Sequence, residues 1–212
     1  MTTKDAKSAK STKVKGHIWV LTIPAIPKGT GTLKGTGTLK GTGGELYNDI
    51  DTDMIFHNRY LHITDVAQMG QYALDNLKGW EDFAKNAQPG DILLAGKNFG
   101  AGSSRQQAVD CFRALGIGAV VAESYGAIYK RNAINSGFPI VVLPDLTEIC
   151  GQFKTGDQVE INFETGKLVL NGERTFQAEP FSRVQMDIYQ AGDLFTYAKA
   201  IPSGYDTAPD QA

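Results

Sequence analysis

The sequence GKNFGAGSSRQQ, at residues 96–107, contains the residue types needed to bind an anion and to move a proton. Its glycines allow the backbone to come close to a ligand. Ser103 and Ser104 bring two hydroxyl groups, and Arg105 brings a guanidinium that can hold a carboxylate by two hydrogen bonds. A helical pattern starts here, and the free N–H groups of a helix start attract negative charge. The segment therefore predicts an anion site.

Helix capping is a second interpretation of the same serines. Ser103 and Ser104 each precede a glutamine by three residues, Gln106 and Gln107, as a capping box requires. Local chemistry alone leaves the anion site and the helix cap equally open.

The residues around this segment predict a βαβαβ unit. Short, almost continuous apolar runs are typical of strands covered on both faces, and the helical patterns between them end at glycines. The predicted strands are residues 91–95, 118–122 and 138–143, and the predicted helices are residues 104–115 and 126–135. The serine-containing loop therefore follows the carboxyl end of a strand, where open α/β sheets bind ligands.

Weaker patterns predict further elements on both sides of this unit. Residues 16–25 are rich in β-branched and aromatic side chains and end at prolines, which favours a first strand. A helix is expected from Thr64, because apolar residues follow it at helical spacing. The C-terminal part predicts a hairpin over residues 157–163 and 167–170 and a helix within residues 181–200.

Composition favours one globular domain with polar ends. Of the 212 residues, 42% are hydrophobic and 21% are charged, and five lysines fall within the first fifteen positions. We predict a disordered basic tail over residues 1–15, a single domain over residues 16–200 and a flexible tail over residues 201–212. A Lys/Gly/Thr repeat over residues 28–44 has too few apolar side chains for a core and predicts a loop insertion.

Several classes of function are excluded by composition. A net charge of −2 lacks the basic surplus that nucleic-acid binding requires, and no apolar run approaches the roughly 20 residues that span a bilayer. With no secretory signal, the expected location is the cytoplasm. Cys111 and Cys150 are too few for an iron–sulfur cluster. Asp51 and Asp53 resemble a metal-binding pair, but no third ligand is near and no metal is assigned.

Three blocks in order resemble the small, or swivel, domain of the aconitase superfamily. The loop motif G-x-N-F-G-x-G-S-S-R is followed by ESYGAIYKRN at residues 123–132 and is preceded by DTD at residues 51–53 and RYL at residues 59–61. Chain length resembles the free-standing small subunits of the isopropylmalate dehydratase type. The resemblance implies an α/β fold, a swivelling domain with three layers in the order β/β/α.

The resemblance also implies a reaction. It implies a heteromeric hydro-lyase that isomerises a small hydroxy-dicarboxylate by dehydration and rehydration, with 3-isopropylmalate as the first substrate and methylmalate, dimethylmalate, homoaconitate or aconitate as alternatives. Ser103 corresponds to the base, and Ser104, Arg105, Gly102 and Asn98 to substrate-binding residues. A large catalytic partner subunit is expected to carry a 4Fe–4S cluster, with no cofactor on this chain. An alternative from a different class of function is a non-catalytic subunit that binds an anion or regulates a partner.

Two departures from the family pattern concern the choice of substrate. Gln106 and Gln107 replace a Glu-His pair, and His57 replaces a proline. The segment that resembles the family's specificity loop consists of Arg59, Tyr60, Leu61, His62 and Ile63. In the family an arginine at the position of His62 suits an extra carboxylate and an apolar residue suits an isopropyl group. Histidine is neither, so a short or modestly branched malate is expected.

Overall fold

A curled sheet of seven strands forms the centre of the molecule. The computed structural model describes residues 10–24 and 44–201. The strands follow the order β4-β3-β2-β1-β5-β6-β7. Their bounds are β1 Lys13–Val20, β2 Ile92–Ala95, β3 Ala119–Ala122, β4 Ile140–Val142, β5 Gln158–Asn162, β6 Lys167–Leu170 and β7 Arg174–Gln177.

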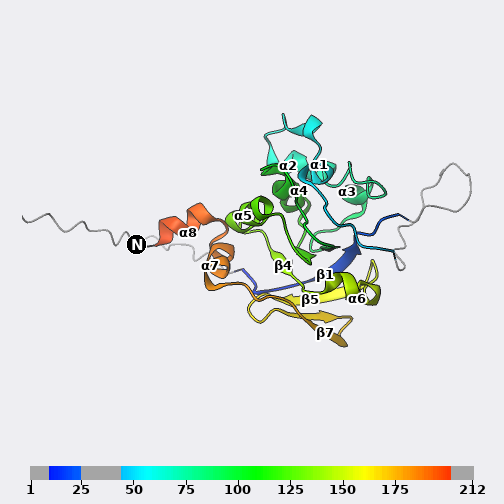
Figure 1. Ribbon diagram of the computed structural model, residues 1–212. Coiled ribbons are helices and arrows are strands. Elements are labelled where there is room, and N and C mark those ends of the chain that lie inside the picture. Colours follow the sequence, from blue (N-terminus) through cyan, green and yellow to red (C-terminus); the bar gives the residue numbers. More distant parts are fainter. Residues whose placement is uncertain (1–9, 25–43, 202–212) are drawn as a thin grey trace, which may run out of the picture.

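Strand β1 belongs to both halves of this sheet. Its first part, Lys13 to His17, pairs antiparallel with β5, and its second part, Ile18 to Val20, pairs parallel with β2. Strands β1 to β4 are parallel, whereas β5, β6 and β7 are antiparallel. Because one strand serves both halves, the antiparallel half can bend across one face of the parallel half (Figure 1).

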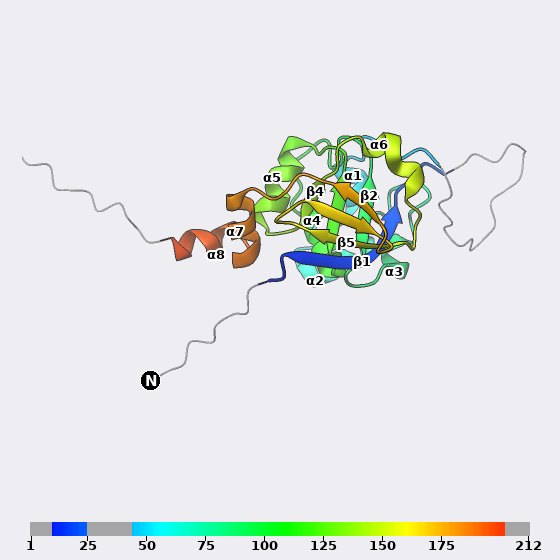
Figure 2. The same cartoon turned by 90° about the horizontal axis from the view of Figure 1, so that it is seen from below.

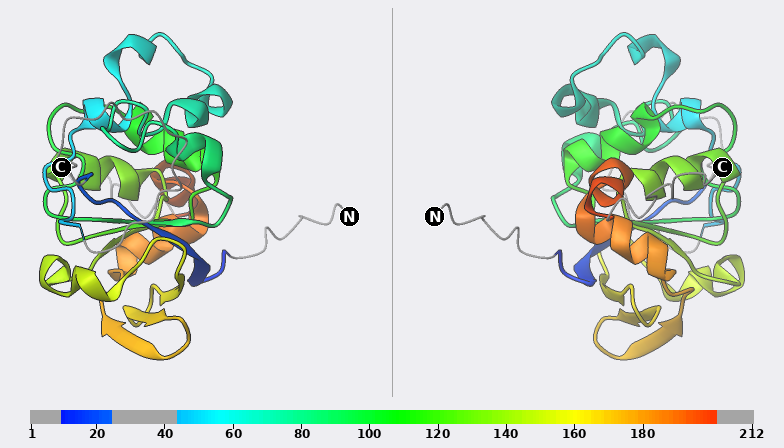
Figure 3. Two further views of the ribbon diagram at one scale, coloured as in Figure 1. Left: turned by 90° about the vertical axis from the view of Figure 1, so that its right-hand side faces the viewer. Right: turned by 90° about the vertical axis from the view of Figure 1, so that its left-hand side faces the viewer.

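Several of the helices cover the other face of the parallel strands. The α-helices are α1 Thr52–Ile55, α2 Val66–Met69, α3 Phe83–Asn86, α4 Gln107–Leu115, α5 Ala127–Asn135, α6 Leu146–Ile149, α7 Arg183–Ala191 and α8 Leu194–Ala200. Short 3₁₀ helices are η1 Asn58–Tyr60, η2 Gly70–Tyr72 and η3 Cys150–Gln152. Helices α1 to α4 lie on the side of the sheet opposite to β5 and β7 (Figures 1 and 3).

The alternation of side chains along the central strands divides the core into two parts. Leu93 and Ala95 of β2 pack with the helices, while Ile92 and Leu94 pack against the antiparallel strands. Figure 2 shows β5 lying across the parallel strands in this way. The layers are therefore β/β/α, and the α/β fold class expected from the sequence is confirmed.

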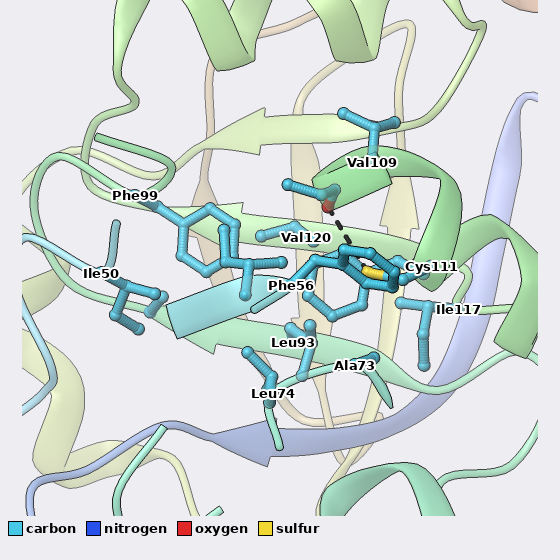
Figure 4. Packing of buried hydrophobic residues seen from close by; sticks show 14 of the residues in the cluster. Ile50, Phe56, Ala73, Leu74, Leu93, Phe99, Val109, Cys111, Ile117 and Val120 are labelled. Carbon is cyan, nitrogen blue, oxygen red and sulfur yellow. Dashed lines mark hydrogen bonds between the residues drawn. The ribbon is translucent and has the colours of Figure 1, made fainter. Parts of the chain in front are cut away.

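The helix-side core packs directly beneath the serine-containing loop. Phe99 of the loop, Phe56 after α1 and Cys111 of α4 are almost fully buried in it, as Figure 4 shows. Phe99 also contacts the ring of Tyr129 edge to face, with ring centroids 5.3 Å apart. An apolar anchor thus fixes the middle of a loop whose ends are polar.

The βαβαβ unit predicted from the sequence is present, with its strands one to three residues shorter than predicted. The predicted hairpin is β5 and β6, but β7, which extends it, was not predicted. Residues 181–200 form two helices instead of one, because Gly192 has a positive φ of 106° between α7 and α8.

Two further predictions were wrong in their bounds. The first strand begins at Lys13, so Lys13 to Lys15 belong to β1 and not to a tail; pairing with β5, which is remote in sequence, extends the strand. The helix expected from Thr64 ends after one turn at Met69, because the chain passes through η2 into a buried left-handed residue, Leu74. The rest of the predicted basic tail, nearly all of the repeat and residues 202–212 lie outside the described residues.

In the described part of the chain, no helix is both long and apolar enough to cross a membrane.

Candidate active site

The serine-containing loop runs beside the segment that precedes α1. Asp51 forms a parallel bridge with Ala101, and the amide of Thr52 donates to the carbonyl of Ala101 at 2.9 Å. The amide of Gly100 donates to the carbonyl of Ile50 at 2.7 Å. This pairing brings together two sequence blocks that lie about fifty residues apart. It therefore sets the distance between their side chains.

Glycines allow the loop to pass close to its neighbours. Gly100 has φ of 77°, and a Cβ there would overlap the ring of Tyr129. Gly102 also has a positive φ, of 92°, but a Cβ there would meet only the side chains of Thr52 and Asp51, at ordinary contact distances of 3.8 and 3.9 Å. The first glycine is thus required by both packing and conformation, and the second by conformation alone.

Asn98 holds the start of the loop in place. It has a left-handed φ of 54°; its amide donates to Ser124 Oγ at 2.9 Å, and its Nδ2 donates to Asp49 Oδ1 at 2.8 Å. Lys97 beside it forms an ion pair with Glu123, with Nζ and Oε1 3.3 Å apart. Asn98, predicted to bind substrate, therefore uses its side-chain donor within the protein.

Neither serine caps the following helix. Helix α4 begins at Gln107, its N-cap is Gln106, and no side chain caps it. The capping interpretation is therefore wrong, because both serines lie too far before the first helical residue. Both are exposed, and among the contacts of the described residues their backbone N–H groups have no acceptor. Two hydroxyls and two free N–H groups thus lie together on the surface.

Within the described part of the chain, each serine hydroxyl has one hydrogen-bond partner. Ser103 Oγ lies 3.2 Å from Oγ1 of Thr52, a residue that is only 3% exposed. Ser104 Oγ accepts a hydrogen bond from Asn132 Nδ2 at 3.4 Å. Thr52 and Asn132 belong to the first and third sequence blocks. Sequence reasoning noted both blocks but assigned no role to either side chain.

Arg105 forms an ion pair with Asp53. Its Nη1 donates to Asp53 Oδ1 at 2.5 Å and to the carbonyl of Phe56 at 3.1 Å. Its Nη2 has no partner among the described residues, so one edge of the guanidinium is left for a ligand. Burial tends to raise the pKa of Asp53, but hydrogen bonds from Arg105 and the Asn58 amide lower it below its ordinary value of 3.8.

Asp51 and Asp53, which resemble a metal-binding pair in the sequence, bind other groups of the protein. Asp51 caps α1, since its Oδ1 accepts from the amides of Asp53 and Met54 at 2.8 and 2.7 Å. Asp53 binds Arg105. Among the described residues, no three His, Cys, Asp or Glu side chains lie together as metal ligands. Cys111 is buried, and Cys150 is half-buried and free.

The residues of the segment predicted to select the substrate, 59–63, differ in their exposure. Tyr60 and Ile63 pack against the core, whereas Arg59, Leu61 and His62 are exposed. His62 turns back on the segment, with Nδ1 2.9 Å from the carbonyl oxygen of Arg59. Only these three side chains are exposed, and of them Arg59 is paired with Asp75.

This segment is joined to the arginine of the loop. Asp53 Oδ1 accepts from the amide of Asn58 at 2.9 Å as well as from Arg105. The start of the segment and the guanidinium thus share one carboxylate oxygen. Residues from three parts of the sequence are thus connected: the Ser103 hydroxyl, the Arg105 guanidinium and segment 59–63.

Comparisons with known proteins agree with this arrangement. The aconitase C-terminal domain profile matches residues 44–145. The chain is 41% identical over 152 residues to the 3-isopropylmalate dehydratase small subunit of Sulfurisphaera tokodaii, spanning 72% of this chain and 88% of that protein. It is 40% identical over 156 residues to the corresponding protein of Metallosphaera sedula, spanning 73% and 93%.

A solved structure gives the same result in three dimensions. The crystal structure of 3-isopropylmalate dehydratase from Methanocaldococcus jannaschii has a TM-score of 0.68 and 31% sequence identity to this chain, covering 88% of it and 93% of that chain. The resemblance seen in three short blocks therefore extends over most of the fold. The chain belongs to the aconitase C-terminal domain family, as a hydro-lyase small subunit of the 3-isopropylmalate dehydratase type.

Proposed function

We propose that this chain, together with a large partner subunit, isomerises 3-isopropylmalate by removing water and adding it back. The observation that supports this proposal most directly is the joint presentation of Ser103, Arg105 and residues 59–63 on one surface. Homologues of the same type carry the name of this enzyme. No observation favours a methylmalate, homoaconitate or aconitate substrate, or a purely regulatory subunit.

Dehydration requires a base for a weakly acidic proton on the carbon next to a carboxylate. In the proposal Ser103 is that base. A serine hydroxyl is far too weak an acid to lose its proton unaided, so its ionised form needs nearby donors. The hydroxyl of Thr52 is within reach at 3.2 Å, and the start of α4 adds partial positive charge.

Substrate carboxylates are proposed to bind at the exposed end of the loop. The free Nη2 edge of Arg105 offers a charged donor, and Ser104 offers a hydroxyl and an N–H group. Gly102 is exposed and has no side chain that would cover the loop at this point. Asn98 is proposed to act by holding the loop, since its Nδ2 binds Asp49.

The hydroxyl that leaves as water needs a Lewis acid. This chain has only two cysteines, fewer than the three or four thiolates that hold a cluster. Its own residues therefore do not fit such a group. We propose that the large subunit carries a 4Fe–4S cluster and covers the loop, and that the assembly works in the cytoplasm, where free thiols persist.

Co-purification with candidate large subunits tests this function. We expect 3-isopropylmalate isomerisation by the assembly, no activity of the isolated chain, and no stoichiometric iron in it. The matched control is an assembly that carries Ser103→Ala. Iron-dependent activity of the chain alone would contradict the two-subunit proposal, and an assembly that binds malates without converting them would favour a regulatory subunit.

A further inference from the structure

Asp75 binds two side chains of segment 59–63. Its Oδ2 accepts a hydrogen bond from the hydroxyl of Tyr60 at 2.6 Å and one from Arg59 Nη2 at 3.0 Å. The Asp75 side chain is 16% exposed, compared with 59% for Arg59. Burial, and then the hydrogen bond to Asp75, raise the pKa of Tyr60. The tyrosine therefore remains a donor at neutral pH.

Aromatic contacts complete this attachment. The ring of Tyr60 stacks on that of Tyr72, with centroids 3.9 Å apart, and the guanidinium carbon of Arg59 lies 4.6 Å from the centroid of Tyr60. The amide of Ile63 donates to the carbonyl of Tyr60 at 2.9 Å. Once Tyr60 is fixed, the turn that carries Leu61 and His62 is fixed with it.

Two local features around Asp75 are unfavourable for stability. Its Oδ1 is buried and has no hydrogen-bond partner among the described residues, which carries a desolvation cost. The preceding residue, Leu74, is fully buried at a left-handed φ of 62°, which is rare for a bulky side chain. Strain of this kind is retained at positions where function requires one geometry.

We infer that Asp75 is a positioning residue: it fixes Arg59 and Tyr60 and thereby sets which substituent on the malate the exposed residues of segment 59–63 accept. Asp75 acts through Tyr60 and does not touch the substrate. The inference rests on the proposed function, because it assigns substrate discrimination to this surface. It explains how a turn with exposed side chains can have a defined shape.

The test uses the assembled enzyme with Asp75→Asn, Tyr60→Phe and the double variant. We expect Asp75→Asn to reduce the ratio of kcat/KM for 3-isopropylmalate to that for 3-methylmalate by about tenfold, within the range that one or two methylene groups supply. Tyr60→Phe keeps the ring stack and should change the ratio in the same direction. The double variant should differ little from the stronger single one, because both single variants act on the Tyr60–Asp75 hydrogen bond, while Asp75→Asn also removes the ion pair with Arg59.

Asp82→Asn is the matched control, since Asp82 forms an exposed ion pair with Lys85 at 2.6 Å elsewhere on the surface. It should leave the ratio unchanged. A purely structural Asp75 would lower activity on both substrates equally and leave their ratio intact, and that result overturns the inference. If Asp75→Asn does not fold, the ratio measured for Tyr60→Phe alone tests the inference.

Amide hydrogen exchange of the full-length chain gives a readout that does not depend on activity. In Asp75→Asn the amides of Leu61 and Ile63 should exchange about tenfold faster, while core amides of β2 stay protected. Unchanged exchange at these amides overturns the positioning role. An inactive wild-type assembly would overturn the proposed function instead, so the two failures are distinguishable.

Discussion

The hydroxyl oxygens of Thr52 and Ser103 lie 3.2 Å apart, although 51 positions separate the two residues in the chain. Thr52 is buried and Ser103 is exposed, so the buried hydroxyl can orient the exposed one. The backbone bond from Thr52 to Ala101 holds the pair together independently of the side chains. Replacement of the hydroxyl therefore tests the contact without moving the loop.

Thr52→Val should lower kcat by about 10²-fold with little change in KM, because it removes one donor to a developing negative charge while keeping the side-chain shape. Steady-state kinetics of the assembled enzyme measure both constants. Thr52→Ser restores the hydroxyl and should restore most of kcat. Equal losses in the Val and Ser variants would mean that packing, and not the hydrogen bond, matters here.

Ser103→Ala should lower kcat by roughly 10²- to 10⁴-fold, the range of general base catalysis. Stability should change by less than about 0.5 kcal/mol, because the serine is exposed and caps no helix. Thermal unfolding and rate are measured on the same variant. Near-normal turnover accompanied by a loss of about 1 kcal/mol would restore the capping interpretation.

Arg105→Lys should reduce kcat/KM by roughly 10- to 100-fold, which corresponds to the free energy of one hydrogen bond to a charged group. A lysine ammonium can replace the ion pair with Asp53 but cannot offer a second, parallel edge to a carboxylate. The midpoint of thermal unfolding should fall only slightly. A variant with unchanged kcat/KM would remove Arg105 from the substrate site.

Asp53→Asn should destabilise the chain at neutral pH and have no such effect in acid. The pKa of Asp53 is lowered in the folded state, so its ionised form stabilises the fold above the ordinary value of 3.8, and this contribution is lost as the pH falls through the folded-state pKa. The difference between the thermal midpoints of the two proteins should be largest near pH 7 and should shrink as the pH falls below 3.8. A constant difference across this range would contradict the ion-pair account.

Gly100→Ala should destabilise the fold by about 2 to 4 kcal/mol, because a left-handed φ and an overlap with the ring of Tyr129 act together. Gly102→Ala is the matched control: its φ is also positive but no atom blocks the methyl group, so about 1 to 2 kcal/mol is expected. Urea unfolding compares the two. Equal losses would show that conformation alone determines the requirement for glycine.

Local sequence patterns were sufficient for the central unit of the fold. Almost continuous apolar runs of five or six residues are typical of strands that are covered on both faces, and glycines at 116 and 137 ended the helices between them. The bounds of the first strand were wrong, and β7 was not predicted. Pairing with segments remote in sequence decides where such strands begin and whether they form.

The sequence by itself determined which residue types the loop brings to the surface: a glycine-rich turn, two serines and an arginine at the start of a helix. Only the tertiary structure decided their partners. Thr52, Asp53 and Asn132 reach the loop because residues 50–52 run beside residues 100–101 and because α5 follows the neighbouring strand. Asp75 reaches Tyr60 through a left-handed turn. Such contacts depend on long-range backbone register, which no local spacing of residues encodes.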